Sequence, residues 1–139
     1  MELTRKNIEQ IELFAWHCIK ELGLKGKITV VLSHKPTGLP TAGFFDPENQ
    51  RIMVAVHNRA MADVFRTIAH ELVHRMQQQT GIIFPSDEEN LRPYESQAND
   101  MGGRLVRVFG RAHPEIYNDL NPTLLSEVMF PNINKLKSI

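Results

Sequence analysis

The sequence has one cysteine, no long hydrophobic run and no excess of either charge. Cys18 has no partner for an internal disulfide, which excludes a disulfide-stabilised scaffold and is typical of a reducing compartment. No stretch approaches the ~20 apolar residues of a membrane span. Residues 1–18 carry charges in every turn and lack an apolar signal core. We therefore expect a cytoplasmic protein that does not associate with membranes.

The charges of the chain cancel, because sixteen Lys and Arg residues face sixteen Asp and Glu residues. Without a net positive field, general nucleic-acid binding is not expected. A hydrophobic fraction of 42% is ordinary for a globular protein, and 139 residues is the length of one domain. We predict a single domain over residues 1–139. The sequence does not indicate its oligomeric state.

The first half of the chain alternates between helical and strand-like patterns. Apolar residues at helical spacing predict an amphipathic helix over residues 3–22 that ends at Gly23. The β-branched stretch 27–33 predicts a strand, and prolines and a glycine after it predict a loop. Residues 41–46 and 51–57 predict a hairpin with a four-residue turn between its strands.

The second half is mainly helical. A continuous apolar stripe predicts a helix from residue 59 or 60 to about 80, with Asn58 as its N-cap and Gly81 as its stop. After a loop over residues 82–91, a further helix is expected to hold Pro93 in its first turn and to end near residue 108 or 109.

The C-terminal part is broken by prolines. Pro114 and Pro122 divide it into two short helical pieces, and a weakly structured tail is expected after about residue 131. The order of elements predicts an α+β fold, with a small mixed or antiparallel sheet of about three strands packed on helices.

The pattern His70-Glu71-Leu72-Val73-His74 carries the functional signal. Two histidines four residues apart on a helix lie on one face, one turn above each other, so both imidazoles can bind one zinc ion. Glu71 can reach a zinc-bound water without binding the metal, and it can act as the catalytic base. This arrangement is typical of an HExxH zinc metallopeptidase.

The same pattern can also occur without any function. A shuffled chain of this composition contains it with a probability of about 2%, and an exposed helix face can carry such residues for solubility alone. The position of the motif in the middle of a predicted helix, with Leu72 and Val73 continuing the apolar stripe, favours the metal interpretation.

A catalytic zinc site has a third protein ligand and an open position. No histidine follows the motif before residue 113, so we expect the ligand to be Glu95 on the next helix. Asn99 shares its face and can hydrogen-bond a ligand histidine. Alternatively, Glu95 only complements the helix dipole. The other acids considered as ligands are Asp100, Glu88 and Glu89.

Two further groups of residues have candidate roles. The transition-state oxyanion could be stabilised by Tyr94, Tyr117, His113 or Arg104, and the spacing does not choose among them. Gly102 and Gly103 lie inside a predicted helix, where each costs ~1 kcal/mol relative to alanine. They either allow a close approach to the zinc helix or mark a kink or an early helix end.

The HELVH motif followed by Glu95-Ser96-Gln97-Ala98-Asn99 resembles gluzincin-type metallopeptidases, and most closely the compact ImmA/IrrE-like family, whose pattern is HExxH followed by ExEAN. Segments 42–46, 51–54 and 65–69 are also similar to that family, and the resemblance covers about residues 28–110. Gln97 stands where the pattern has a second glutamate. SprT-like proteases are a weaker likeness, because they have a further histidine soon after the motif.

The resemblance implies a minimal zincin-like metalloendopeptidase that binds one Zn²⁺ per chain through His70, His74 and Glu95, with Glu71 as the base. The expected partner is a protein or peptide substrate, held as an added strand along the hairpin over residues 41–57. The alternative is a non-catalytic, zinc-containing binding or structural subunit on the same scaffold.

Overall fold

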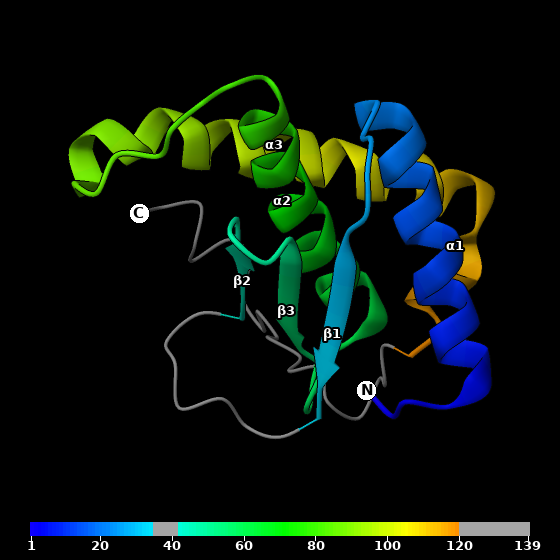
Figure 1. Ribbon diagram of the computed structural model, residues 1–139. Helices are drawn as coiled ribbons and strands as arrows, with labels where there is room; N and C mark the ends of the chain where they lie inside the picture. The colour runs from blue at the N-terminus through cyan, green and yellow to red at the C-terminus, as the bar shows by residue number, and fades with distance from the viewer. Residues whose placement is uncertain (35–41, 120–139) are drawn as a thin grey trace, which may run out of the picture.

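The computed structural model describes residues 1–34 and 42–119. It shows an α+β fold in which a three-stranded mixed sheet packs on helices, as the sequence predicts (Figure 1). The elements in chain order are α1 (Arg5–Leu22), β1 (Thr29–Ser33), β2 (Gly43–Asp46), β3 (Arg51–Ala55), α2 (Met61–Gln79), α3 (Glu88–Ala112) and the short 3₁₀ helix η1 (Pro114–Tyr117). The predicted helical piece after Pro122 and the tail after residue 131 lie outside the described residues.

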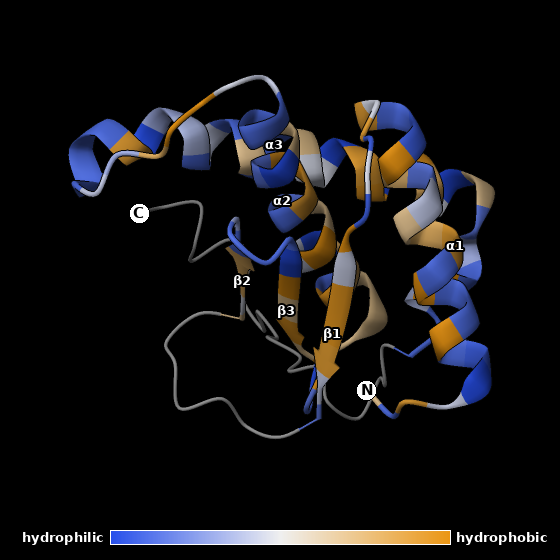
Figure 2. Ribbon diagram, in the orientation of Figure 1, coloured by the Kyte–Doolittle hydropathy of each residue, from blue (hydrophilic) through white to orange (hydrophobic). Residues whose placement is uncertain are grey.

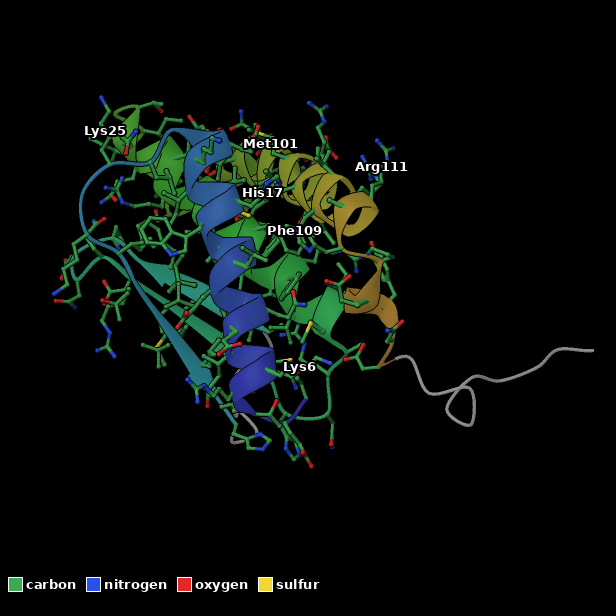
Figure 3. The ribbon with its side chains drawn as sticks, turned by 90° about the vertical axis from the view of Figure 1, so that its right-hand side faces the viewer. Lys6, His17, Lys25, Met101, Phe109 and Arg111 are labelled. Atoms are coloured by element: carbon green, nitrogen blue, oxygen red, sulfur yellow. The ribbon has the colours of Figure 1, made fainter. Side chains whose placement is uncertain are left out.

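The sheet has the order β1-β3-β2, so that β3 is central and β2 forms an edge. β3 runs parallel to β1 and antiparallel to β2, and Ile52 is the register partner of Val30 and of Phe45. Ile52 and Val54 are fully buried. Both belong to the core cluster that also contains the buried residues of α1, α2 and α3. The helices gather on one side of the sheet (Figures 1 and 3).

α2 is the central helix of the fold and packs on α1, on α3 and on strands β2 and β3. Its apolar stripe is buried because it faces the sheet and both other helices, and Figure 2 shows the apolar strands lying over it. Phe14 of α1 stacks on Phe65 of α2, with ring centroids 4.3 Å apart, and meets Phe109 of α3 edge to face. These three rings join the helices into one core.

α1 ends at Gly23 as its sequence predicts, but it begins at Arg5, two residues after the predicted start. The Thr4 hydroxyl accepts a hydrogen bond from the Asn7 N–H, and Gly23 closes the helix in the left-handed conformation at φ 63°. Figure 3, which views the molecule from the side of α1, shows His17 and Phe109 lying close together beneath it. Trp16 points outward and is 68% exposed.

The predicted N-cap of α2 is wrong. Asn58 lies two residues before Ala60, which is the N-cap, and Asn58 adopts the left-handed conformation at φ 53°. Ala60 has no side-chain acceptor, and the Asp119 carboxylate takes that role by accepting a hydrogen bond from the Met61 N–H at 2.6 Å. A distant part of the chain therefore caps this helix, and no local pattern could indicate it.

The predicted limits of α3 are also wrong, because the helix begins at Glu88 and ends at Ala112. Asp87 is the N-cap, and its carboxylate accepts a hydrogen bond from the Asn90 N–H at 3.0 Å. Pro93 consequently lies inside the helix and not in its first turn. Its missing N–H would have bonded to the carbonyl of Glu89, an exposed residue for which water can serve as the partner.

Candidate metal centre

The two motif histidines lie one turn apart on α2, on the face that turns toward α3. Their Nε2 atoms are 3.1 Å apart, and their ring centroids are 4.7 Å apart. Leu72 and Val73, between them in sequence, are fully buried in the core. The core face of α2 therefore fixes the direction of the histidine face.

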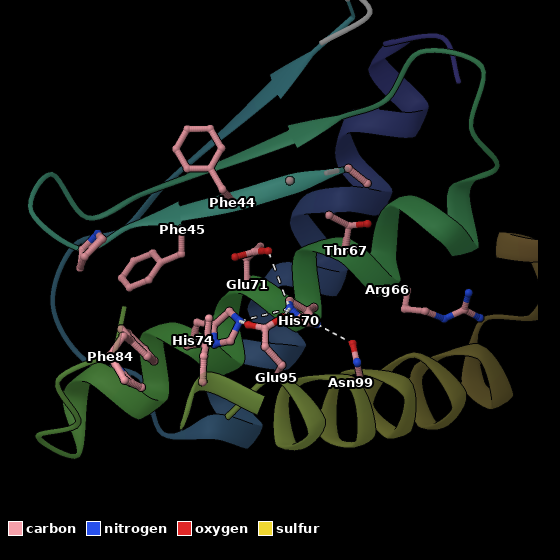
Figure 4. Close-up of a pocket in the computed structure, with 15 residues that line it drawn as sticks. Phe44, Phe45, Arg66, Thr67, His70, Glu71, His74, Phe84, Glu95 and Asn99 are labelled. Atoms are coloured by element: carbon pink, nitrogen blue, oxygen red, sulfur yellow. Dashed lines mark hydrogen bonds and ion pairs between the residues drawn. The ribbon is translucent and has the colours of Figure 1, made fainter. Parts of the chain in front are cut away.

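Glu95 on α3 completes a cluster with the two histidines (Figure 4). Its Oε1 lies 2.6 Å from His74 Nε2, and its Oε2 lies 3.4 Å from His70 Nε2. Because α3 begins at Glu88, Glu95 is two turns inside the helix, and the first-turn acids are Glu88 and Glu89. The helix-dipole interpretation therefore does not explain Glu95.

The three donor atoms can hold a single metal ion. They all lie within 4.8 Å of one another. Ligand atoms at the Zn–N and Zn–O distances of ~2.0–2.1 Å in a tetrahedron are roughly 3.3 Å apart, which is close to the separations observed here. Two imidazoles and a carboxylate are also a donor set that zinc prefers.

Both histidines are oriented by amide side chains. Asn99 Oδ1 lies 2.8 Å from His70 Nδ1, and Gln77 Oε1 lies 2.8 Å from His74 Nδ1. An amide oxygen only accepts, so each Nδ1 carries the proton and donates it. Each Nε2 is thereby left with its lone pair directed at the cluster, as a metal ligand requires.

Gln77 is the residue that sequence reasoning missed. It is fully buried, and its Nε2 donates to the Tyr94 carbonyl at 3.0 Å and to Gln97 Oε1 at 2.8 Å. The amide thus links His74 to α3. Its spacing of three residues from His74, on the same helix face, was the available signal.

Glu71 lies beside the cluster without joining it. Its Oε1 is 4.0 Å from His70 Nε2, and the residue is 6% exposed. Burial, together with the negative charge of Glu95, raises the pKa of Glu71 to about 8. Burial and the neighbouring His74 lower the pKa of His70. A cation in the cluster would offset the repulsion between the two carboxylates.

One of the two helix glycines permits the contact between α2 and α3. A Cβ on Gly102 would lie 3.1 Å from the His70 backbone nitrogen and 3.4 Å from its Cα. A Cβ on Gly103 would meet only the Arg107 guanidinium, at 3.7 Å. Close approach therefore explains Gly102 but not Gly103.

The other candidate residues do not line the cavity next to the cluster. Tyr117 packs against Gly110, His113 stacks on the Phe109 ring, and Arg104 is exposed. Tyr94 offers its carbonyl to Gln77. These four do not line the cavity next to the cluster, and the alternative ligands Asp100, Glu88 and Glu89 are exposed on α3 outside it.

That cavity has a volume of about 670 Å³. It lies between β2, α2 and α3, with His70, His74 and Glu95 in its wall together with Glu71. A volume of this size is typical of small-molecule and peptide side-chain sites. The cluster is therefore accessible to a ligand.

No family model matches the chain, and neither the curated proteins nor the solved structures contain a significant match. Among the helices in residues 1–34 and 42–119, none has the length and apolar character needed to cross a bilayer. Within the described residues, two histidines and one glutamate offer ligand atoms close enough together to hold one metal ion, in an α+β fold.

Proposed function

We propose that the protein is a zinc-dependent endopeptidase. We further propose that it acts in the cytoplasm, because its single cysteine, Cys18, is buried and unpaired. The observation that carries the proposal is the convergence of His70, His74 and Glu95 next to a buried Glu71. Together these supply three ligands and a base at the wall of an accessible cavity.

Zinc at this site would act as a Lewis acid and would lower the pKa of water to near neutrality. Glu71 accepts a proton from the attacking water at its Oε1 and passes it to the nitrogen of the leaving amine. The water oxygen first bonds to the carbonyl carbon, and the C–N bond breaks once the nitrogen has received the proton from Glu71. In the metal-free protein, burial and the charge of Glu95 raise the pKa of Glu71. A cation bound by Glu95 would lower that pKa again and leave Glu71 ionised, as a proton acceptor must be.

The substrate is a peptide in extended conformation. β2 is the edge strand of the described sheet, and Ala42 to Phe45 line the cavity. A peptide added along the edge of β2 that no described strand occupies would pass the metal ligands and make backbone hydrogen bonds, whatever its sequence.

Metal analysis and peptide cleavage test the proposal. The purified protein is expected to contain about one zinc per chain, and His74→Ala is expected to lose both zinc and hydrolysis. Glu71→Gln is expected to keep zinc and to lose cleavage of a quenched-fluorescence peptide library. Asp100→Asn is the matched control, because Asp100 is an exposed acid on the same helix as Glu95.

The same experiment separates the enzyme from a non-catalytic metal protein. Zinc in the wild type together with no cleavage of any library peptide would favour a binding or structural subunit. A wild-type protein without zinc after expression in metal-replete medium would overturn the metal site itself.

A further inference from the structure

The cavity next to the metal centre has an apolar end. Five side chains form it, and we call them the apolar end throughout: Phe45, Pro47, Phe84, Pro85 and Leu91. They come from β2 and the turn after it, from the connection between α2 and α3, and from the beginning of α3. Segments far apart in sequence thus supply one uncharged wall.

The apolar end begins at a metal ligand. The Phe84 ring meets the His74 ring edge to face, with centroids 5.6 Å apart and an interplanar angle of 83°. On its other side Phe84 meets the Tyr94 ring at 6.1 Å. Phe84 is therefore held in place between a metal ligand and α3, and it turns inward, whereas its neighbour Ile83 is 93% exposed.

The turn that carries Pro47 is fixed to α2. The Gln50 amide donates to the Pro47 carbonyl at 2.6 Å and to Gln78 Oε1 at 2.9 Å. The Gln78 amide donates to the same carbonyl at 3.1 Å. This side of the wall is preformed, which lowers the ordering cost of binding a ligand.

The opposite end of the cavity is polar. Figure 4 shows Phe45 and Phe84 at the His74 end, and Arg66, Thr67 and Asn99 at the His70 end. The Arg66 side chain is 64% exposed, and the Thr67 hydroxyl accepts a hydrogen bond from Arg59 at 2.6 Å. The His74 end is therefore the more favourable place for a large apolar group, although Phe44 also lines the cavity.

We propose that the apolar end binds a large apolar side chain of the substrate, adjacent to the bond that is cleaved. This inference rests on the proposed peptidase function and adds a substrate class to it, namely peptides with an aromatic or large aliphatic residue at that position. Phe84 is the specificity-determining residue, because it contacts the bound side chain and His74 together.

Two hydroxamic acids test this without knowledge of the natural substrate. Acetohydroxamic acid binds an open zinc site through its metal-binding group alone, and 3-phenylpropanohydroxamic acid adds a phenyl group. Their affinities for the zinc-loaded protein are measured by isothermal titration calorimetry. The test variant is Phe84→Ala, and Ile83→Ala is the matched control, which removes an adjacent exposed apolar side chain outside the cavity.

The wild type and Ile83→Ala are expected to prefer the phenyl compound by about 10-fold or more. Phe84→Ala is expected to lose most of that preference, and the readout is the ratio of its affinities for the two compounds, because the loss of the ring next to His74 can change both. A Phe84→Ala variant that keeps the wild-type ratio would overturn the role of Phe84. Equal affinities of the wild type for both compounds would overturn the apolar subsite and leave the metal site standing. If neither compound binds the zinc-loaded wild type, the open metal site fails and the subsite fails with it.

Discussion

Replacing Gly102 by alanine tests whether the close contact of α2 with α3 sets the geometry of the metal centre. The new Cβ would lie 3.1 Å from the backbone nitrogen of His70, and a backbone atom in a helix cannot move aside alone. Overpacking of this kind costs ~1–3 kcal/mol, against a gain of ~1 kcal/mol from alanine in a helix. We expect Gly102→Ala to destabilise the metal-free protein by ~0–2 kcal/mol.

Gly103→Ala is the matched control, with the opposite sign. Its Cβ would meet only a flexible guanidinium at 3.7 Å, so the helix gain remains and we expect stabilisation by ~1 kcal/mol. The assay is urea unfolding in EDTA followed by far-UV circular dichroism. Fluorescence is a poor probe, because the single tryptophan, Trp16, is already 68% exposed in the folded protein.

The same pair of variants is then compared in zinc affinity, by competition with a chromophoric chelator. Displacing α3 moves Glu95 relative to His70, so Gly102→Ala is expected to bind zinc about 10-fold more weakly, and Gly103→Ala is expected to bind it as the wild type does. If both variants gain the same stability and bind zinc equally, the helix contact does not position the ligands.

Three further predictions concern the base, the buried amide and the core. In EDTA, Glu71→Gln is expected to become more stable relative to the wild type as pH rises from 4.5 to about 8, by up to ~1.4 kcal/mol per pH unit. In this range the unfolded wild type has an ionised Glu71, whereas the folded wild type must take up a proton on it, so its stability falls as pH rises. Parallel urea titrations across this range would show no divergence if the carboxyl is solvated. Gln77→Leu removes the acceptor of the His74 Nδ1 proton, and chelator competition is expected to show zinc binding weakened ~10–100-fold with the fold retained; unchanged affinity contradicts the orienting role. Phe14→Ala is expected to cost ~3–5 kcal/mol in urea unfolding, because Phe14 is fully buried and stacks on Phe65; a loss below 1 kcal/mol would show that the core collapses around the missing ring.

The parts of the site that the sequence predicts are those that a helix repeat determines. His70 and His74 share a face because four residues make about one turn, and Glu95 and Asn99 share a face for the same reason. The sheet was predictable because β-branched residues cluster in short segments, with a turn between the last two strands.

The parts that could not be predicted depend on contacts between distant segments. Gln77 lies next to Gln97 only after α2 and α3 have packed, so its link to α3 could not be predicted, although its spacing from His74 was a local signal for the contact with that ring. The cap of α2 comes from Asp119, 58 residues away from Met61. The predicted beginning of α3 is wrong because proline favours the first turn of a helix, whereas here Asp87 caps the helix six residues before Pro93.

The placement of the ligands on two helices links the stability of the protein to zinc. Since the histidines and Glu95 belong to different helices, an ion bound between them ties those helices together and stabilises only the native chain. Each tenfold rise in free zinc above the dissociation constant would then add ~1.4 kcal/mol to the free energy of unfolding. Under metal starvation the chain would unfold more often and would be degraded sooner, so zinc supply would govern its abundance as well as its chemistry.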